Sequence, residues 1–226
     1  VEEKMYMKVT SVYGLTEAAP GMTATRIDDP FDVRCNTVGH DFEHTEVRVI
    51  DPETGEECPV GVQGEMCNRG YNTMKGYYKN PQATAEVIDK NNFLHSGDLG
   101  IKDEDGNYRI TGRIKDMIIR GGENIYPREI EEFLYKLDGV KDVQVSGIPS
   151  KKYGEAVGAF IILHEGVTMQ ASDVQDFCRN KISRYKIPKY IFFIDEFPMT
   201  GSGKIQKFKL KDLGLKLCEE QGIQII

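Results

Sequence analysis

Long apolar runs are missing from this chain of 226 residues. The longest candidate, residues 157–163, has the length of a β-strand and falls far short of the roughly 20 apolar residues that a transmembrane helix needs. The first residues also lack the apolar centre of a secretory signal peptide. The sequence therefore predicts a chain with no transmembrane segment.

Cysteine patterns that build disulfide frameworks or zinc sites are missing too. The 5 cysteines are odd in number and widely spaced, and no Cys-x-x-Cys pair occurs. This distribution favours a reduced protein of the cytoplasm. Internal repeats and low-complexity tracts are also absent, which excludes the repeat architectures.

Acidic residues outnumber basic ones in the chain as a whole, 36 against 29, but not in its last part. The net charge is −7, yet residues 179–216 carry ten Lys or Arg against three acids, a local +7 that leaves −14 elsewhere. Such a segment is either a solvated face or a surface that attracts an anion such as a phosphate-bearing small molecule. The overall acidity and the lack of a recognised nucleic-acid module argue against a nucleic-acid partner.

Residues 1–112 are predicted to be rich in short strands. Residues 45–50 alternate apolar and polar side chains, residues 64–68 form another short strand, and residues 103–106 form a hairpin turn. Asn80 and Pro81 supply an N-cap and a first helical residue, so a short helix is expected over 81–88. Many short strands separated by turns indicate a barrel-like or bent sheet.

The pattern changes after Arg113, and residues 117–226 are predicted to form a small α+β domain. A helix is expected from Pro127 to Gly139, a second one from a capping box at 172–175 to about residue 182, and a Lys-rich helix after Lys207. Strands are expected over 143–148, 156–163 and 190–194. The fold class is therefore α+β with two domains and helices over one sheet in the second, joined by a hinge at 113–116.

Two segments of the first domain carry residues that suit a nucleotide. In Tyr13-Gly14-Leu15-Thr16-Glu17 a glycine permits close backbone approach, and a hydroxyl and a carboxylate follow it, suited to phosphate and Mg²⁺. In Leu94–Leu99 the carboxylate of Asp98 beside a glycine suits two ribose hydroxyls. Taken singly, each segment is equally well a polar turn, and His95 receives no role.

Two later segments add basic side chains and glycine turns. Residues 111–127 contain Arg113 and Lys115 at the predicted boundary, and Gly121-Gly122 in a tight exposed turn. Residues 198–207 hold Lys204 in a flexible loop that fails the Walker A pattern. A linker with a hairpin, and an exposed loop lysine, are the plain alternatives.

Together and in this order, these segments resemble the later signature motifs of the adenylate-forming (AMP-binding) superfamily. The matching stretches are 13–17, 64–84, 96–98, 112–127 and 198–207, and the resemblance extends over essentially the whole chain. Residues 69–81 with 113–132 are most similar to bacterial medium- and long-chain fatty acyl-CoA synthetases. The resemblance implies the C-terminal part of a ligase that makes acyl-CoA from a carboxylic acid, ATP and coenzyme A by way of acyl-AMP.

The resemblance also implies a role for each motif residue. In the first domain Tyr13 with Gly14 would hold adenine, Thr16 the α-phosphate, Glu17 a Mg²⁺ ion, and Asp98 with Arg113 the ribose. In the second, the expected roles are the hinge for Lys115, the pantetheine tunnel for Gly121 and Gly122, and the adenylation lysine for Lys204. Thr16, Glu17 and Lys204 would be the catalytic residues.

The phosphate-binding loop and acyl pocket that precede these motifs in the superfamily are not in the sequence, so we expect a fragment that is inactive without the N-terminal part of its enzyme. Two alternatives stay open within the superfamily: an adenylation domain that loads a carrier protein, and a ligase for aromatic acids. A third, of another class, is an isolated binding module without catalysis.

Overall fold

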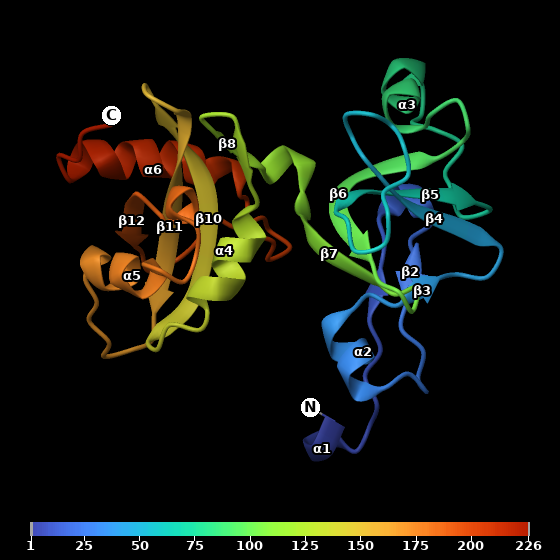
Figure 1. Ribbon diagram of the computed structural model, residues 1–226, viewed down its shortest axis with the longest axis horizontal. Coiled ribbons are helices and arrows are strands. Elements are labelled where there is room, and N and C mark those ends of the chain that lie inside the picture. The colour runs from blue at the N-terminus through green and yellow to red at the C-terminus, as the bar shows by residue number, and fades with distance from the viewer. Residues whose placement is uncertain (1, 226) are drawn as a thin grey trace. The chain divides into compact units, whose positions relative to one another are not determined.

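The computed structural model describes residues 2–225, and the chain divides into two compact units between Ile114 and Lys115. Figure 1 shows the first unit as two small antiparallel sheets with short helices, and the second as a larger sheet between helices. Within the described residues, no helix has the length and apolarity to span a membrane. The predicted α+β class, with a strand-rich first part, is confirmed.

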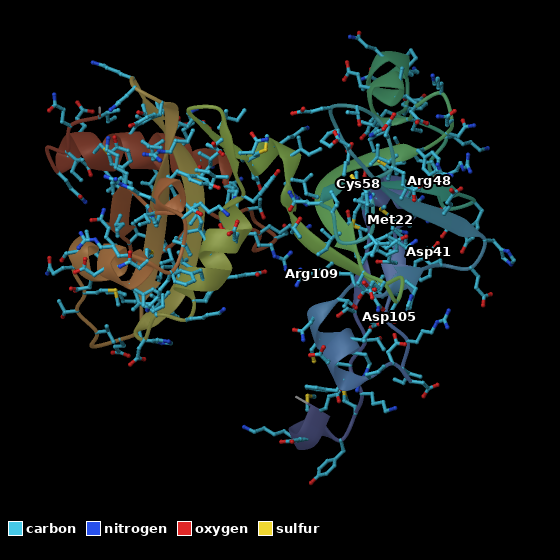
Figure 2. All side chains as sticks on the ribbon, viewed as in Figure 1. Met22, Asp41, Arg48, Cys58, Asp105 and Arg109 are labelled. Atoms are coloured by element: carbon cyan, nitrogen blue, oxygen red, sulfur yellow. The ribbon has the colours of Figure 1, made fainter. Side chains whose placement is uncertain are left out.

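The first unit contains a four-stranded antiparallel sheet in the order β4-β5-β6-β7. Its strands are β4 (Thr45–Ile50), β5 (Gly64–Gly70), β6 (Leu94–Lys102) and β7 (Tyr108–Arg113). Side chains alternate between buried and exposed: Tyr108 is fully buried, whereas the next residue, Arg109, is exposed and labelled in Figure 2. Over residues 2–225 this sheet stays open, so the expected barrel-like shape is a bent, unclosed sheet.

A three-stranded sheet of β1 (Val12–Tyr13), β2 (Thr23–Ala24) and β3 (His40–Asp41) completes this unit. The short helices are α1 (Glu2–Met5), η1 (Thr16–Ala18), α2 (Phe31–Asn36) and α3 (Pro81–Val87). α3 begins as predicted, because the Asn80 side chain accepts a hydrogen bond from the Ala83 amide at 3.1 Å and Pro81 occupies the first turn. The core includes Met22 (Figure 2), which is fully buried with β4 and β5 side chains.

The second unit is built on a long hairpin of β10 (Val140–Ser150) and β11 (Gly154–Leu163). β12 (Tyr190–Phe193) pairs parallel with β11, and the hairpin of β8 (Ile118–Arg120) and β9 (Glu123–Ile125) joins through Gly154 and Arg120. The connecting helices are η2 (Ile114–Asp116), α4 (Pro127–Leu134), α5 (Ala171–Cys178), η3 (Arg184–Lys186) and α6 (Phe208–Glu220).

Helices cover both faces of this sheet, since alternate residues of one strand point to opposite sides. On β11, Val157 and Ala159 pack in the cluster with α4 and α5, whereas Ala156 and Phe160 pack in the cluster with α6. The predicted helices over one sheet are therefore confirmed, and the structure adds that they form a layer on each face (Figure 1).

The predicted capping box at 172–175 is wrong. The N-cap is Gln170, whose backbone amide donates to the Asp173 carboxylate at 2.8 Å. The helix runs only from Ala171 to Cys178. The expected end near residue 182 is also too late, because Arg179 leaves the helical conformation and Asn180 has φ +60°.

Candidate functional site

Asp98 is the centre of a hydrogen-bonded group in the first unit. Its carboxylate accepts from Arg113 Nε at 2.7 Å through Oδ1 and from the Tyr13 hydroxyl at 2.8 Å through Oδ2. The Asp98 side chain is 12% exposed and that of Arg113 is 67% exposed. The two lie opposite each other on β6 and β7, so the sheet register sets the pair. Three residues predicted for one site are thus brought together.

A bulge in β6 places Asp98 at this point. Cys67 pairs with His95 and Glu65 pairs with Leu99, so one residue of β5 lies opposite the three residues 96–98 of β6. Gly97 takes φ +74°, which glycine adopts without strain. Bulges bend a strand and re-aim a side chain, and they are frequent beside functional sites.

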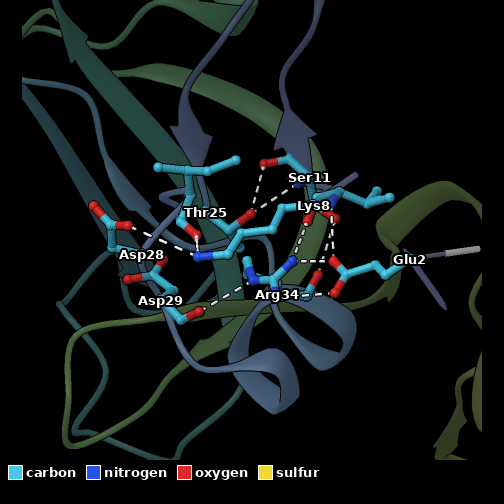
Figure 3. A network of polar contacts seen from close by, with 9 residues as sticks. Glu2, Lys8, Ser11, Thr25, Asp28, Asp29 and Arg34 are labelled. Atoms are coloured by element: carbon cyan, nitrogen blue, oxygen red, sulfur yellow. Dashed lines mark hydrogen bonds and ion pairs between the residues drawn. The ribbon is translucent and has the colours of Figure 1, made fainter. Parts of the chain in front are cut away.

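Tyr13 is held through its own backbone, whose carbonyl accepts from the Met22 amide at 2.8 Å, and through the chain that precedes it. On its N-terminal side, the buried Arg34 pairs with Glu2 and donates to the Val9 carbonyl at 3.0 Å, and the Ser11 amide donates to Thr25 Oγ1 at 2.8 Å (Figure 3). Burial raises the pKa of the Tyr13 phenol, so at neutral pH the phenol keeps its proton and donates a hydrogen bond to the Asp98 carboxylate.

Gly14 is required by the chain itself. A Cβ at this position would lie 1.9 Å from the Pro20 carbonyl oxygen, closer than any real contact. The sequence suggested that this glycine allows close approach of a ligand; the structure shows that it allows close approach of the backbone at Pro20 and Gly21.

Thr16 and Glu17 follow in η1, where Thr16 is exposed and Glu17 is partly buried. The Tyr77 hydroxyl donates to Glu17 Oε1 at 2.9 Å, and the Met74 amide donates to the Glu17 carbonyl at 2.8 Å. Tyr77 lies in the stretch 69–81 that carried part of the resemblance, but sequence reasoning gave it no role. An open hollow of about 1030 Å³ lies beside it, lined by residues 69–70, 73–81 and parts of 84–92.

The sequence also missed a polar cluster behind the bulge, made of Glu65, Cys67 and His95. One ligand-type atom from each lies within 4.8 Å of the others, a spacing a metal ion could use. The buried Glu65 carboxylate is already hydrogen-bonded, however, to His95 Nδ1 at 2.7 Å and to the Gly97 amide at 2.8 Å. The hydrogen bond to Glu65 raises the pKa of His95, and burial raises that of Cys67. No local pattern marks this cluster, because the pairing of β5 with β6 brings its members together.

Lys115 is the first residue of the second unit. It lies within η2, and its side chain is exposed. Gly121 and Gly122 form the two-residue turn of the β8–β9 hairpin with φ +61° and +91°, the left-handed pair that such hairpins prefer. Both glycines are exposed, and the Gly121 amide donates to the Tyr153 carbonyl at 2.8 Å. The predicted tight exposed turn is confirmed.

Lys204 lies at the base of a short loop before α6. Met199 and Ile205 form an isolated bridge, and Thr200 closes the loop with bonds to the Lys204 carbonyl and amide at 2.8 and 3.0 Å. The backbone is thus held while the side chain is exposed, with no polar partner for Nζ among residues 2–225. An exposed lysine ammonium group of this kind can bind an anion.

The family model of the AMP-binding enzyme matches residues 1–78, and that of the AMP-binding enzyme C-terminal domain matches residues 129–204. The chain belongs to the AMP-binding enzymes. The order of the two matches is the order of the two units.

Two curated relatives of this AMP-binding enzyme chain cover nearly all of it. YngI of Bacillus subtilis (strain 168), named as a candidate acyl-CoA synthetase, is 51% identical over 218 residues, which are 96% of this chain and 40% of YngI. The rat mitochondrial medium-chain acyl-CoA ligase ACSF2 is 44% identical over 210 residues, 92% of this chain and 34% of that protein. The chain therefore spans about a third to two fifths of these relatives.

Solved structures of adenylate-forming enzymes show the same fold. The ATP-bound structure of MatB from Rhodopseudomonas palustris has a TM-score of 0.86 at 35% identity, covering 91% of this chain and 40% of MatB. The o-succinylbenzoate-CoA synthetase MenE of Bacillus subtilis, in complex with its acyl-adenylate intermediate, has a TM-score of 0.80 at 32% identity, covering 93% of this chain and 42% of MenE.

Proposed function

We propose that this chain is the C-terminal part of an AMP-forming acyl-CoA synthetase that acts on a fatty acid, ATP and coenzyme A. The observation that carries the proposal is the group of Asp98, Arg113 and Tyr13, a buried carboxylate held in place within an AMP-binding enzyme chain. The similarity to YngI and to ACSF2, both named for acyl-CoA formation, supports the acyl-CoA branch.

The proposed reaction has two displacement steps. A carboxylate oxygen of the acid attacks the α-phosphorus of ATP, the bond to the bridging oxygen breaks, and pyrophosphate leaves. The thiolate sulfur of coenzyme A then attacks the acyl carbon, and AMP leaves with the electron pair of its phosphate oxygen. Each step builds negative charge on oxygen, which positioned cations and hydrogen-bond donors stabilise.

The first unit would bind the nucleotide. Each Asp98 oxygen accepts one protein hydrogen bond, and a carboxylate oxygen has room for a second, so both remain available to ribose hydroxyls. Arg113 would keep the carboxylate oriented. The Tyr13 ring would lie against adenine, and Thr16 would hold the α-phosphate.

Glu17 fits the proposed Mg²⁺ ion, because a partly exposed carboxylate is a hard oxygen ligand of the kind that this ion prefers. Tyr77 occupies one of its oxygens, Oε1, and the described residues place no hydrogen bond on the other. Magnesium would supply charge neutralisation of the phosphates. Tyr77 would orient the carboxylate that receives it.

The second unit would supply the mobile groups. Lys204 would approach the carboxylate and α-phosphate oxygens during adenylation, Lys115 would be the hinge about which this unit turns, and Gly121 and Gly122 would line the pantetheine tunnel in the thioester step. Free cysteines support a reducing cytoplasmic setting as part of the proposal.

The test uses the complete enzyme from which this chain derives. ATP–pyrophosphate exchange that depends on a medium-chain fatty acid, followed by acyl-CoA formation with coenzyme A, is the expected result. Exchange that depends on an aromatic acid would identify the rival aromatic-acid ligase, and acyl transfer to a carrier protein would identify the rival adenylation domain. Pyrophosphate exchange that needs no added acid would contradict the proposal.

The 226-residue chain alone is the second sample. We expect no pyrophosphate release from it with ATP and a fatty acid, because its relatives are more than twice as long. Calorimetric titration with AMP and with coenzyme A tests the alternative of an isolated binding module: tight binding of either ligand by the chain alone would favour that module.

A further inference from the structure

The bulge that carries Asp98 depends on a side chain of the neighbouring strand. Three residues of β6 lie opposite one residue of β5, so backbone groups of the bulge lose their ladder partners. Buried backbone donors without a partner are costly, and native structures satisfy nearly all of them. The backbone amides of residues 96–98 therefore need other acceptors.

Side chains accept from two of the backbone amides of the bulge, those of Gly97 and Asp98. The Gly97 amide donates to Glu65 Oε1 at 2.8 Å, and the Asp98 amide donates to Ser96 Oγ at 3.0 Å. Glu65 is 7% exposed and also bonds His95 Nδ1 at 2.7 Å through its other oxygen. One buried carboxylate therefore ties both the residue that precedes the bulge and the middle of the bulge to β5.

We propose that Glu65, oriented by His95, is a positioning residue for the nucleotide: it holds the Ser96–Asp98 bulge so that the Asp98 carboxylate faces the ribose. The inference rests on the proposed function, because it names what fixes the nucleotide-binding carboxylate. Neither Glu65 nor His95 contacts Asp98 through a side chain, so their effect on the nucleotide is transmitted by the Gly97 backbone.

The hydrogen-bond pattern favours this role over a metal site in the same cluster. Both Glu65 oxygens already have protein donors at ordinary hydrogen-bond distances, and Cys67 Sγ lies 3.4 Å from the same His95 nitrogen that bonds Glu65. A metal ion would have to replace the bond between His95 and Glu65.

The test compares variants of the complete enzyme by their KM for ATP and by their preference for ATP over 2′-deoxy-ATP. Glu65→Ala should raise the KM for ATP about tenfold, the effect of one lost hydrogen bond to a charged group, and shrink the preference for ATP, with less change in kcat. Glu65→Gln keeps an acceptor for the Gly97 amide. Compared with Glu65→Ala, this variant should recover most of the wild-type KM for ATP and most of the preference for ATP. In an Asp98→Asn background, Glu65→Ala should add little further loss.

Controls separate positioning from stability. Glu46→Gln alters another carboxylate of the same sheet, one paired with Arg48 and Arg69, and should leave the KM for ATP unchanged. His95→Ala keeps the bond between Glu65 and Gly97 and serves if Glu65→Ala does not fold; its rise in KM should be the smaller one. An unchanged preference for ATP in whichever variant folds would overturn the proposal.

Hydrogen exchange of the Gly97 amide gives a readout that needs no catalysis. Exchange should be slow in the wild-type protein and accelerate in Glu65→Ala but not in Glu46→Gln. If the wild-type enzyme lacks ATP–pyrophosphate exchange while Gly97 is protected, the proposed function has failed. If catalysis is present and Gly97 exchanges equally fast in all variants, the positioning role has failed.

Discussion

The two charged groups proposed to act on the nucleotide have opposite surroundings. Asp98 is buried, and sheet register, a bulge and two side-chain donors fix its carboxylate. Lys204 is exposed, and only the backbone of its loop is held. The carboxylate proposed to bind the ribose is thus pre-organised within one unit, whereas the lysine proposed for adenylation would be positioned only when the substrate is present.

The largest expected effect concerns Lys204, the exposed group of this comparison. In the complete enzyme, Lys204→Ala should reduce adenylation by about 10²–10³, the typical cost of removing one positioned stabiliser of developing charge. Thioester formation from preformed acyl-AMP should persist. Pyrophosphate exchange and acyl-CoA production from synthetic acyl-AMP measure the two steps separately.

Lys151 offers the matched control, because it is also an exposed loop lysine of the second unit. Lys151→Ala should leave both steps unchanged. Equal losses of both steps in Lys204→Ala would show that this lysine is not specific to adenylation.

The next largest effect concerns Asp98, the group that hydrogen bonds hold in place. Asp98→Asn removes the charge from the proposed acceptor of the ribose hydroxyls and should raise the KM for ATP by about tenfold to a hundredfold. The variant should also lose the preference for ATP over 2′-deoxy-ATP. Steady-state kinetics with both nucleotides measure this, and a preference equal to that of wild type would remove Asp98 from the ribose site.

A smaller effect concerns the glycine turn of the second unit. Gly122 has φ +91° with open space around it, so Gly122→Ala should cost about 1–2 kcal/mol of unfolding free energy through backbone strain alone. Gly201 also has open space but no left-handed conformation, and Gly201→Ala should leave stability unchanged. Urea unfolding measures both; equal midpoints for the two variants would contradict the strain argument.

The smallest effect is a pH dependence at the polar cluster behind Asp98. Glu65, with a further contribution from Asp89, raises the pKa of His95 in the folded state above its unfolded value. The resulting stability is fully present below the unfolded pKa and is lost as pH rises through the folded pKa. The melting temperature of wild type should therefore exceed that of His95→Gln more at about pH 5.5 than at about pH 8.5. A difference that grows with pH would reverse the argument.

Local patterns predicted local structure well. Strand 45–50 and the start of the 81–87 helix follow from alternation and from an Asn-Pro cap, signals that act within a few residues. The cap of α5 was misplaced because Ser172 belongs to the residue types preferred at an N-cap, whereas the observed N-cap, Gln170, does not.

Motifs predicted which residues would matter in the first unit, but not how they are held. Tyr13, Asp98 and Arg113 were named from the sequence, and the structure places them in contact. Glu65 and Tyr77 could not be found in this way, since their partners lie 32 and 60 residues away along the chain. Contacts of this separation depend on strand register, which no local pattern specifies.

The most direct test of the account asks whether Asp98 and Lys204 serve the same nucleotide. Adenosine carrying a sulfonyl fluoride on its 5′ side forms a covalent bond with a lysine held near the phosphates and releases fluoride. In the complete enzyme, we expect mass spectrometry to find the label on Lys204, with labelling prevented by ATP and greatly reduced by Asp98→Asn. Label on other lysines only, or on Lys204 with no dependence on ATP or Asp98, would contradict the account.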